Sequence, residues 1–203
     1  MTLLRSIAWA AAATLASASV AHAGQLTIVE VAAPPINCVF HLNCIIPVTD
    51  STAPVPLPFT AGSPFLQSRT FGGTLGTPAA GMFGYEYRLD LSSAAGALDC
   101  LLGLVVDFGP VATLPYATGK TGHVYVIKQG GLGTVGIKSA EQDGSVITFE
   151  FDKPMCVGTN AGMGQSTFFF GAASTKQPHE ITAGIYGFGS PPFISLKARA
   201  PNH

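Results

Sequence analysis

Two segments of the chain alternate between apolar and polar residues with a period of two, and this pattern constrains the fold most strongly. In YEYRLDL, residues 85–91, Tyr and Leu alternate with Glu, Arg and Asp. In VITFEFD, residues 146–152, Ile and Phe alternate with Thr, Glu and Asp. Successive side chains of a β-strand point to opposite faces, so each segment predicts an antiparallel strand with one buried and one solvated face.

Other apolar segments and the turns between them extend this pattern along the chain. Residues 100–109 and 166–174 are apolar at nearly every position and predict central strands, and Asp143-Gly144 predicts a hairpin turn. With 24 Gly, 15 Pro and only 10% charged residues, the composition favours short strands and turns over helices. We therefore expect an all-β fold, an antiparallel β-sandwich that is jelly-roll-like and has about eight to ten strands.

One long segment does not fit a regular sheet. Residues 45–81 contain six prolines, and proline removes a backbone donor and fixes φ. We expect a Pro/Gly-rich loop near the N-terminus that wraps the sandwich, with disorder as the alternative. Within it, residues 53–59 (APVPLPF) should be extended as polyproline II, and residues 65–73 should form at most one edge strand.

The first 23 residues have the features of a secretory signal peptide. Arg5 is followed by an apolar run to about residue 20, and residues 21–23 (AHA) have the small-x-small form of a cleavage site. The alternative is a membrane anchor, but the run is shorter than the roughly 20 residues of a membrane span. We expect cleavage near Ala23, a secreted, periplasmic or extracellular protein without a transmembrane anchor, and a single β-sandwich domain over residues 24–203.

The charge of the expected mature chain bears on its partners. Removal of residues 1–23 takes away Arg5 and no acidic residue, which leaves nine Lys and Arg against eleven Asp and Glu and a net charge of −2. No run of basic residues is present. Because neutralising phosphates requires clustered Lys and Arg, we expect no nucleic-acid partner.

Four cysteines favour disulfides in an exported chain. Three connectivities are open, and we expect Cys38–Cys44 and Cys100–Cys156, the second beside two predicted strands. A metal site would use Cys38, Cys44 and His41, but zinc sites usually place two to four residues between cysteines and here five intervene. The redox motif Cys-x-x-Cys is absent as well. We therefore expect no metal and no cofactor.

Residues that could support catalysis do not form a recognisable motif. GQSTF, residues 164–168, lacks the second Gly of a nucleophile elbow, so Ser166 is interpreted as a hydroxyl at a strand edge. Glu150 and Asp152 share one strand face and could act as a glycosidase pair, but a solvated outer face explains them better. Asp107 interrupts an apolar segment and is interpreted as capping the Gly109-Pro110 turn. We expect that the chain is not an enzyme.

Several motifs resemble a loose class of uncharacterised exported bacterial proteins, many of which carry a C-terminal sorting tail of the PEP-CTERM type. The resemblance rests on GYEYRLDL, CLLGLVVDFGPV, Cys156 and STFFFG, and covers about residues 81–200. The chain ends in ISLKARAPNH, without a PEP motif or an apolar span, so the resemblance does not imply surface anchoring by that route. It implies an exported β-rich protein and supplies no activity or site residue.

These observations lead to two functional hypotheses and a weaker third. The first is a non-enzymatic structural protein of the cell surface or extracellular matrix, which could self-associate through its sheet edges. The second is a carbohydrate- or small-ligand-binding module that uses exposed aromatic residues, with Tyr116, Tyr125 and Tyr186 as candidates. The only Trp, Trp9, lies in the predicted signal peptide and cannot serve such a site. A secreted hydrolase is the third.

Overall fold

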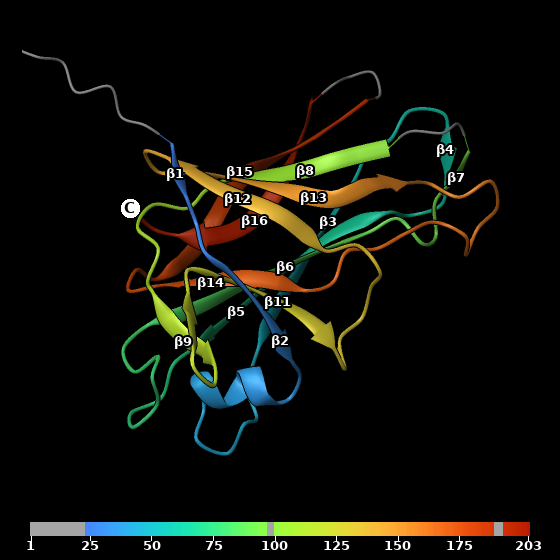
Figure 1. Cartoon of the computed structure of the whole chain (residues 1–203). Helices are drawn as coiled ribbons and strands as arrows, with labels where there is room; N and C mark the ends of the chain where they lie inside the picture. The colour runs from blue at the N-terminus through green and yellow to red at the C-terminus, as the bar shows by residue number, and fades with distance from the viewer. Residues whose placement is uncertain (1–22, 97–99, 189–192) are drawn as a thin grey trace, which may run out of the picture.

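The structure, a computed structural model, describes residues 23–96, 100–188 and 193–203, and its regular structure is nearly all β-strand. Two six-stranded sheets form the two layers (Figure 1). In spatial order, sheet 1 consists of β1 (Gly24–Gln25), β12 (Ile137–Asp143), β13 (Val146–Cys156), β8 (Cys100–Asp107), β15 (Pro178–Gly187) and β16 (Phe193–Pro201). Sheet 2 consists of β2 (Ile28–Ala32), β11 (Val124–Gln129), β14 (Phe170–Ser174), β6 (Phe83–Asp90), β5 (Phe65–Gly72) and β3 (Thr49–Pro54).

Four short strands and one short helix of the described residues lie outside the two sheets. The strands form two pairs, and the helix is a 3-10 helix close to the N-terminus. They are β9 (Leu114–Ala117) with β10 (Lys120–Gly122), β4 (Thr60–Ala61) with β7 (Ala95–Gly96), and η1 (Pro35–Val39). Among residues 23–96, 100–188 and 193–203, no helix is long and apolar enough to cross a membrane.

The pairing confirms the prediction of an all-β antiparallel sandwich. Neighbouring strands are antiparallel in both sheets, except for the parallel pair β2 and β11. The predicted hairpin joins β12 to β13, where Asp143 pairs with Val146. Gly144 in this turn has a φ of 59°, a conformation that glycine adopts without the steric cost of a side chain. The predicted signal peptide, apart from Ala23, lies outside the described residues.

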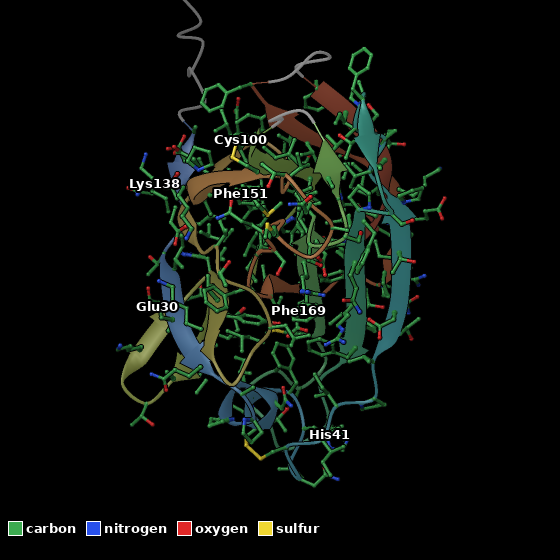
Figure 2. The ribbon with its side chains drawn as sticks, turned by 90° about the vertical axis from the view of Figure 1, so that its right-hand side faces the viewer. Glu30, His41, Cys100, Lys138, Phe151 and Phe169 are labelled. Atoms are coloured by element: carbon green, nitrogen blue, oxygen red, sulfur yellow. A yellow bond between two sulfur atoms is a disulfide. The ribbon has the colours of Figure 1, made fainter. Side chains whose placement is uncertain are left out.

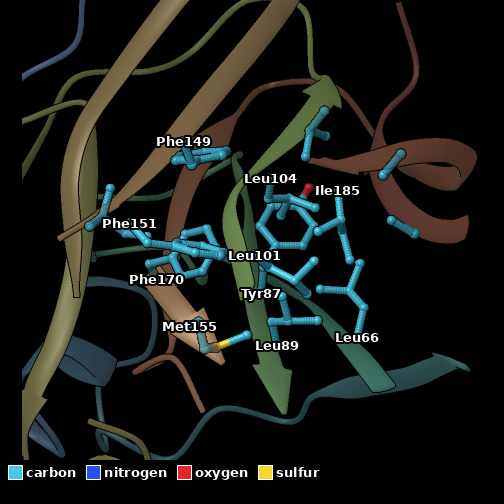
Figure 3. Close-up of a cluster of buried hydrophobic side chains, with 14 of the residues drawn as sticks. Leu66, Tyr87, Leu89, Leu101, Leu104, Phe149, Phe151, Met155, Phe170 and Ile185 are labelled. Carbon is cyan, nitrogen blue, oxygen red and sulfur yellow. The ribbon is translucent and has the colours of Figure 1, made fainter. Parts of the chain in front are cut away.

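The main core lies between the sheets and is built by alternate residues, as the sequence pattern predicts. Phe149 of β13, Tyr87 of β6 and Phe170 of β14 are fully buried and meet there (Figure 3). The Phe170 ring centroid lies 5.1 Å from that of Phe149 and 6.0 Å from that of Tyr87. The Tyr87 hydroxyl donates a hydrogen bond to the Arg199 carbonyl of β16, at 2.8 Å. The buried phenol therefore keeps a polar partner across the core.

The opposite face of β6 corrects a prediction. The alternating pattern predicts Glu86 and Asp90 on a solvated face, yet both are buried, with 2% and 6% of their surface exposed. The chain before β3 and the chain between β5 and β6 fold over the outer face of sheet 2. They build a second apolar cluster that consists of Val29, Val31, Ile36, Val39, Phe40, Phe71, Ala79, Leu114, Tyr116, Tyr125, Ile127, Phe169 and Ala173. Sheet 2 is therefore covered on both faces around Glu86, whereas its edge strand β3 is mostly exposed.

The segment 45–81 is also more regular than predicted. Six residues of β3 pair with β5, and all eight residues of β5 pair with β6, so both strands belong to sheet 2. The edge strand is β3 and not the segment 65–73. Of the prolines in this segment, only Pro54 lies within a strand, at the end of β3, where an edge strand tolerates a missing donor. The prediction of a long wrapping loop is thus wrong for β3 and β5.

Both predicted disulfides are present. Cys100 and Cys156 are directly opposite each other on β8 and β13, so this bond joins two neighbouring strands of sheet 1. Cys38 and Cys44 close a loop that begins within η1, at the end of the molecule that carries His41 (Figure 2). The His41 Nδ1 lies 2.6 Å from the Asn43 side-chain oxygen, within the same loop. The cysteines near His41 therefore form a covalent link that fixes the loop.

The two open sides of the sandwich differ. On one side the N-terminal segment pairs first with β12 of sheet 1, through β1, and then with β11 of sheet 2, through β2. On the other side β16 is the edge of sheet 1 and β3 the edge of sheet 2. The exposed Lys197–Glu180 ion pair, with an Nζ to Oε1 distance of 3.0 Å, places charge on β16. Such charges reduce edge-to-edge pairing, and self-association remains a prediction.

Candidate functional site

Two of the three predicted binding tyrosines lie inside the protein. Tyr125 is fully buried and Tyr116 is 2% exposed, and their ring centroids lie 4.8 Å apart in the second apolar cluster. The Tyr125 hydroxyl donates a hydrogen bond to the Glu86 carboxyl group, at 3.0 Å. Neither ring is available as an exposed stacking surface, because the chain segments over sheet 2 cover this face. The prediction is therefore wrong for these two residues in that role.

Tyr186 is placed differently, on the outer face of sheet 1. It pairs with Phe193 of β16 on one side and with Gly103 of β8 on the other. Opposite residues of antiparallel strands share a face, so the two rings lie side by side. Phe193 is 50% exposed, and Phe188, two residues beyond Tyr186, is 73% exposed. We call these three residues, Tyr186, Phe188 and Phe193, the aromatic strip.

Two glycines allow the rings of the strip to lie on the sheet. A Cβ atom at Gly103 would be 2.5 Å from the Tyr186 hydroxyl oxygen, and one at Gly184 would be 1.8 Å from the tip of the Phe193 ring. Both distances are too short for real side-chain contacts. The rings therefore lie across the glycines, and any larger residue at Gly103 or Gly184 would displace them.

Charged and hydroxyl groups continue the same row beyond Gly103. Glu150 of β13 is opposite Gly103, and Ser139 of β12 is opposite Glu150. The Lys138 ammonium donates to one Glu150 oxygen, at 2.9 Å, and the Ser139 hydroxyl donates to the other, at 3.1 Å. These hydrogen bonds lower the pKa of Glu150, that from Lys138 most, so the carboxylate is ionised at neutral pH.

The row borders a shallow hollow of about 340 Å³. Tyr186 and Phe188 line it together with Leu102, and the polar lining comes from Glu150, Asp152, Lys138 and Lys153. Burial raises the pKa of the Tyr186 phenol, and the nearby Glu150 charge acts in the same direction. The phenol thus stays protonated and can donate a hydrogen bond. The site offers flat apolar surface beside fixed donors and acceptors.

Several of the polar groups that could support catalysis have partners within the protein. Glu150 is held ionised by Lys138, which does not suit the general acid of a glycosidase pair, although the second carboxylate of such a pair is ionised. His203 lies 2.9 Å from the Asp107 carboxylate, and its second ring nitrogen faces the Pro201 carbonyl. Asp107 therefore holds the C-terminal residue, in contrast to its predicted role at the Gly109-Pro110 turn.

His123 and His179 both hydrogen-bond to backbone groups of other strands or segments. The Nδ1 atom of His123 accepts a hydrogen bond from the Thr27 amide, and that of His179 lies 3.1 Å from the Ala200 carbonyl. Among the described residues, no group of three His, Cys, Asp or Glu side chains is placed to hold a metal ion.

Sequence reasoning found Tyr186 but missed its neighbours. The signal that could have found them is the spacing of Tyr186, Phe188 and Phe193 around the Gly- and Pro-rich segment 187–192, which is typical of a hairpin that returns on the same face. Comparisons of the chain with protein families, curated proteins and solved structures find no match.

Proposed function

We propose that this chain is an exported, non-catalytic β-sandwich of the cell surface or extracellular matrix that binds polysaccharide through the aromatic strip. Export is supported by the signal-like residues 1–23 and by the two disulfides, which form and persist in oxidising compartments. The single observation that carries the binding proposal is the row Phe193–Tyr186–Gly103–Glu150 across the outer face of sheet 1.

The chemistry of this row suits a sugar ring. A pyranose has an apolar face of C–H groups and a rim of hydroxyl groups. The Tyr186 and Phe193 rings supply apolar surface for that face, in the arrangement by which aromatic side chains contribute contact area with little loss of conformational freedom. Glu150 can accept from a sugar hydroxyl, and Lys138 can donate to one. A strip on a flat sheet leaves both ends open, as a polymer requires.

The paired charges do not suit Glu150 to the role of a general acid. A side chain that transfers a proton works best with a pKa near the working pH, and Lys138 and Ser139 move the pKa of Glu150 away from that range. Glu150 is consequently assigned the role of a hydrogen-bond acceptor.

The test is a panel of soluble oligosaccharides and insoluble polysaccharides, read by glycan array and by sedimentation with the insoluble material. We expect saturable binding to at least one neutral glycan. Tyr186→Ala should weaken it about 10-fold, since the loss of roughly 55 Å² of buried apolar surface at about 25 cal/mol per Å² costs about 1.4 kcal/mol.

Phe59 provides the matched control, because it is 93% exposed and directly precedes β4, outside the strip. Phe59→Ala should leave glycan binding unchanged. If no glycan binds, or if Phe59→Ala weakens binding as much as Tyr186→Ala does, the proposed function is wrong. Turnover of a bound glycan would contradict the non-catalytic part alone.

A further inference from the structure

A second hollow, larger than the one beside the strip, lies between η1 and the β9–β10 hairpin. It has a volume of about 610 Å³, within the range of small-molecule sites. Strand β2 and the end of β11 complete its walls. Cys38, one of its lining residues, is bonded to Cys44 in the loop that carries His41, and Figure 2 shows His41 and Cys100 at opposite ends of the molecule. The hollow, which we call the η1 cleft, is separate from the aromatic strip.

The walls of the η1 cleft are mostly apolar and stiff. Pro35, Pro78 and Pro115 each contribute, and Ile36 and Val39 of η1 line the cleft as nearly buried side chains with little exposed surface. Proline has a fixed φ, and the helix itself is tied by the disulfide of Cys38, another lining residue. A ligand that enters such a site pays little for ordering the walls, because they are already in place.

The polar groups of the cleft carry an excess of one positive charge. Lys128 forms an ion pair with Glu30, and both residues line the cleft. Lys120, on β10, lines it as well and has no ion-pair partner among the described residues. One ammonium group is therefore free to pair with a ligand, beside apolar walls.

We propose that the η1 cleft binds an amphipathic monoanion, an alkyl carboxylate of the fatty-acid class. The alkyl chain would lie against the proline and aliphatic walls, and the carboxylate would pair with the Lys120 ammonium. Glu30 disfavours a ligand with two or more negative charges, because its carboxylate is part of the same site. Tyr116 is the only aromatic residue among the described lining residues, so the walls suit an alkyl chain better than a stacked ring.

The test uses four small probes of graded chemistry and amide NMR of the folded, disulfide-bonded protein. Octanoate should bind saturably and shift resonances from η1, β9 and the end of β11. Both 1-octanol, which lacks the charge, and acetate, which lacks the chain, should bind more weakly. Octyltrimethylammonium, with the opposite charge, should bind the least of the three octyl probes.

Variants separate the charge from the cleft. Lys120→Ala should weaken octanoate binding about 2- to 5-fold, the effect of an exposed ion pair, and leave octanol unchanged. Lys120→Arg should restore it, and Lys153→Ala, at the hollow beside the aromatic strip, should have no effect. Ala117→Leu, which fills the cleft from β9, should weaken both octyl probes while the remaining spectrum confirms the fold.

Three results would overturn the proposal. They are the absence of saturable octanoate shifts at the cleft, equal affinities for octanoate and octanol, and an unchanged octanoate affinity in Lys120→Ala. Glycan binding uses the other site and should be unaffected by Lys120→Ala. If no glycan binds, the outcome of the octanoate test still stands.

Discussion

Replacement of Glu86 by Gln should change how the stability of this protein depends on pH. Glu86 lies between sheet 2 and the chain segments over it, and burial raises its pKa from 4.5 to about 7. The hydrogen bond from Tyr125 and the charge of Arg69 act against burial, and the charge of Asp50 acts with it. Arg69 is itself paired with Asp50, at 2.8 Å, which limits its effect on Glu86.

The sign follows from proton binding. Between pH 4.5 and about 7 the folded state holds a proton on Glu86 that the unfolded chain has released. The contribution of Glu86 to the free energy of unfolding is therefore highest below pH 4.5. It falls as the pH rises from 4.5 to about 7 and is constant above that. A shift of this size corresponds to roughly 3 kcal/mol.

The side-chain amide of the Glu86→Gln variant has no proton to lose in this range, and its oxygen can still accept the Tyr125 hydrogen bond. The variant should lack the fall in stability. Urea denaturation at intervals between pH 4.5 and 8 would measure it, as the difference in unfolding free energy between variant and parent. That difference should rise by roughly 3 kcal/mol toward pH 8.

Glu141→Gln is the matched control, since Glu141 is an exposed carboxylate on β12. Its difference from the parent should not change comparably over the same range. A difference for Glu86→Gln that is constant with pH would refute the reasoning, because it would mean that Glu86 is not protonated in the folded protein near neutral pH.

Two further perturbations test the cores and the covalent framework. Replacing Cys100 and Cys156 by Ser should lower the unfolding free energy by about 4 kcal/mol, because the disulfide closes a loop with a sequence separation of 56. Calorimetry or urea unfolding would measure the loss. A loss under about 1 kcal/mol would contradict the entropic argument. Tyr125→Phe removes the hydroxyl that lowers the pKa of Glu86, so the upper limit of the pH window in which stability falls should move upward, while the lower limit, set by the unfolded chain, stays near pH 4.5. An upper limit that is unchanged or lower in the same titration would show that the hydroxyl does not stabilise the carboxylate.

The sequence predicted correctly which side chains are buried where a strand's own alternating pattern decides the buried face. In β13, alternate residues Ile147, Phe149 and Phe151 are buried and Asp152 is exposed, as predicted. The cysteine pairing was predicted from the expected export of the chain and from the positions of Cys100 and Cys156 beside strands. The turn at Gly144 followed from the conformational freedom of glycine.

The sequence did not predict the burial of side chains where a segment distant in the chain covers one face of a sheet. The charged side of β6 has the pattern of a solvated face, yet η1 and the loop before β6 lie over sheet 2 and bury Glu86. The same cover removes Tyr116 and Tyr125 from the surface. Nothing in the local pattern of β6 or β11 tells whether a proline-rich segment elsewhere in the chain will pack there.

The candidate site, too, could be predicted only in part from the sequence. Tyr186 could be selected as an aromatic on a strand, but its row with Glu150 depends on the register of β15 with β8 and of β8 with β13. Register between strands that are far apart in sequence is set by core packing, which a single sequence does not display.

The aromatic strip on sheet 1 is the proposed polysaccharide-binding surface. Amide NMR of the isotope-labelled protein, titrated with the soluble oligosaccharide that binds best, would show whether the sugar contacts it. We expect saturable shifts at Tyr186, Phe193 and Gly103 and at Glu150 across the row, with the η1 cleft unchanged. Saturable shifts confined to any other surface, or no shifts with the whole panel, would contradict this proposal.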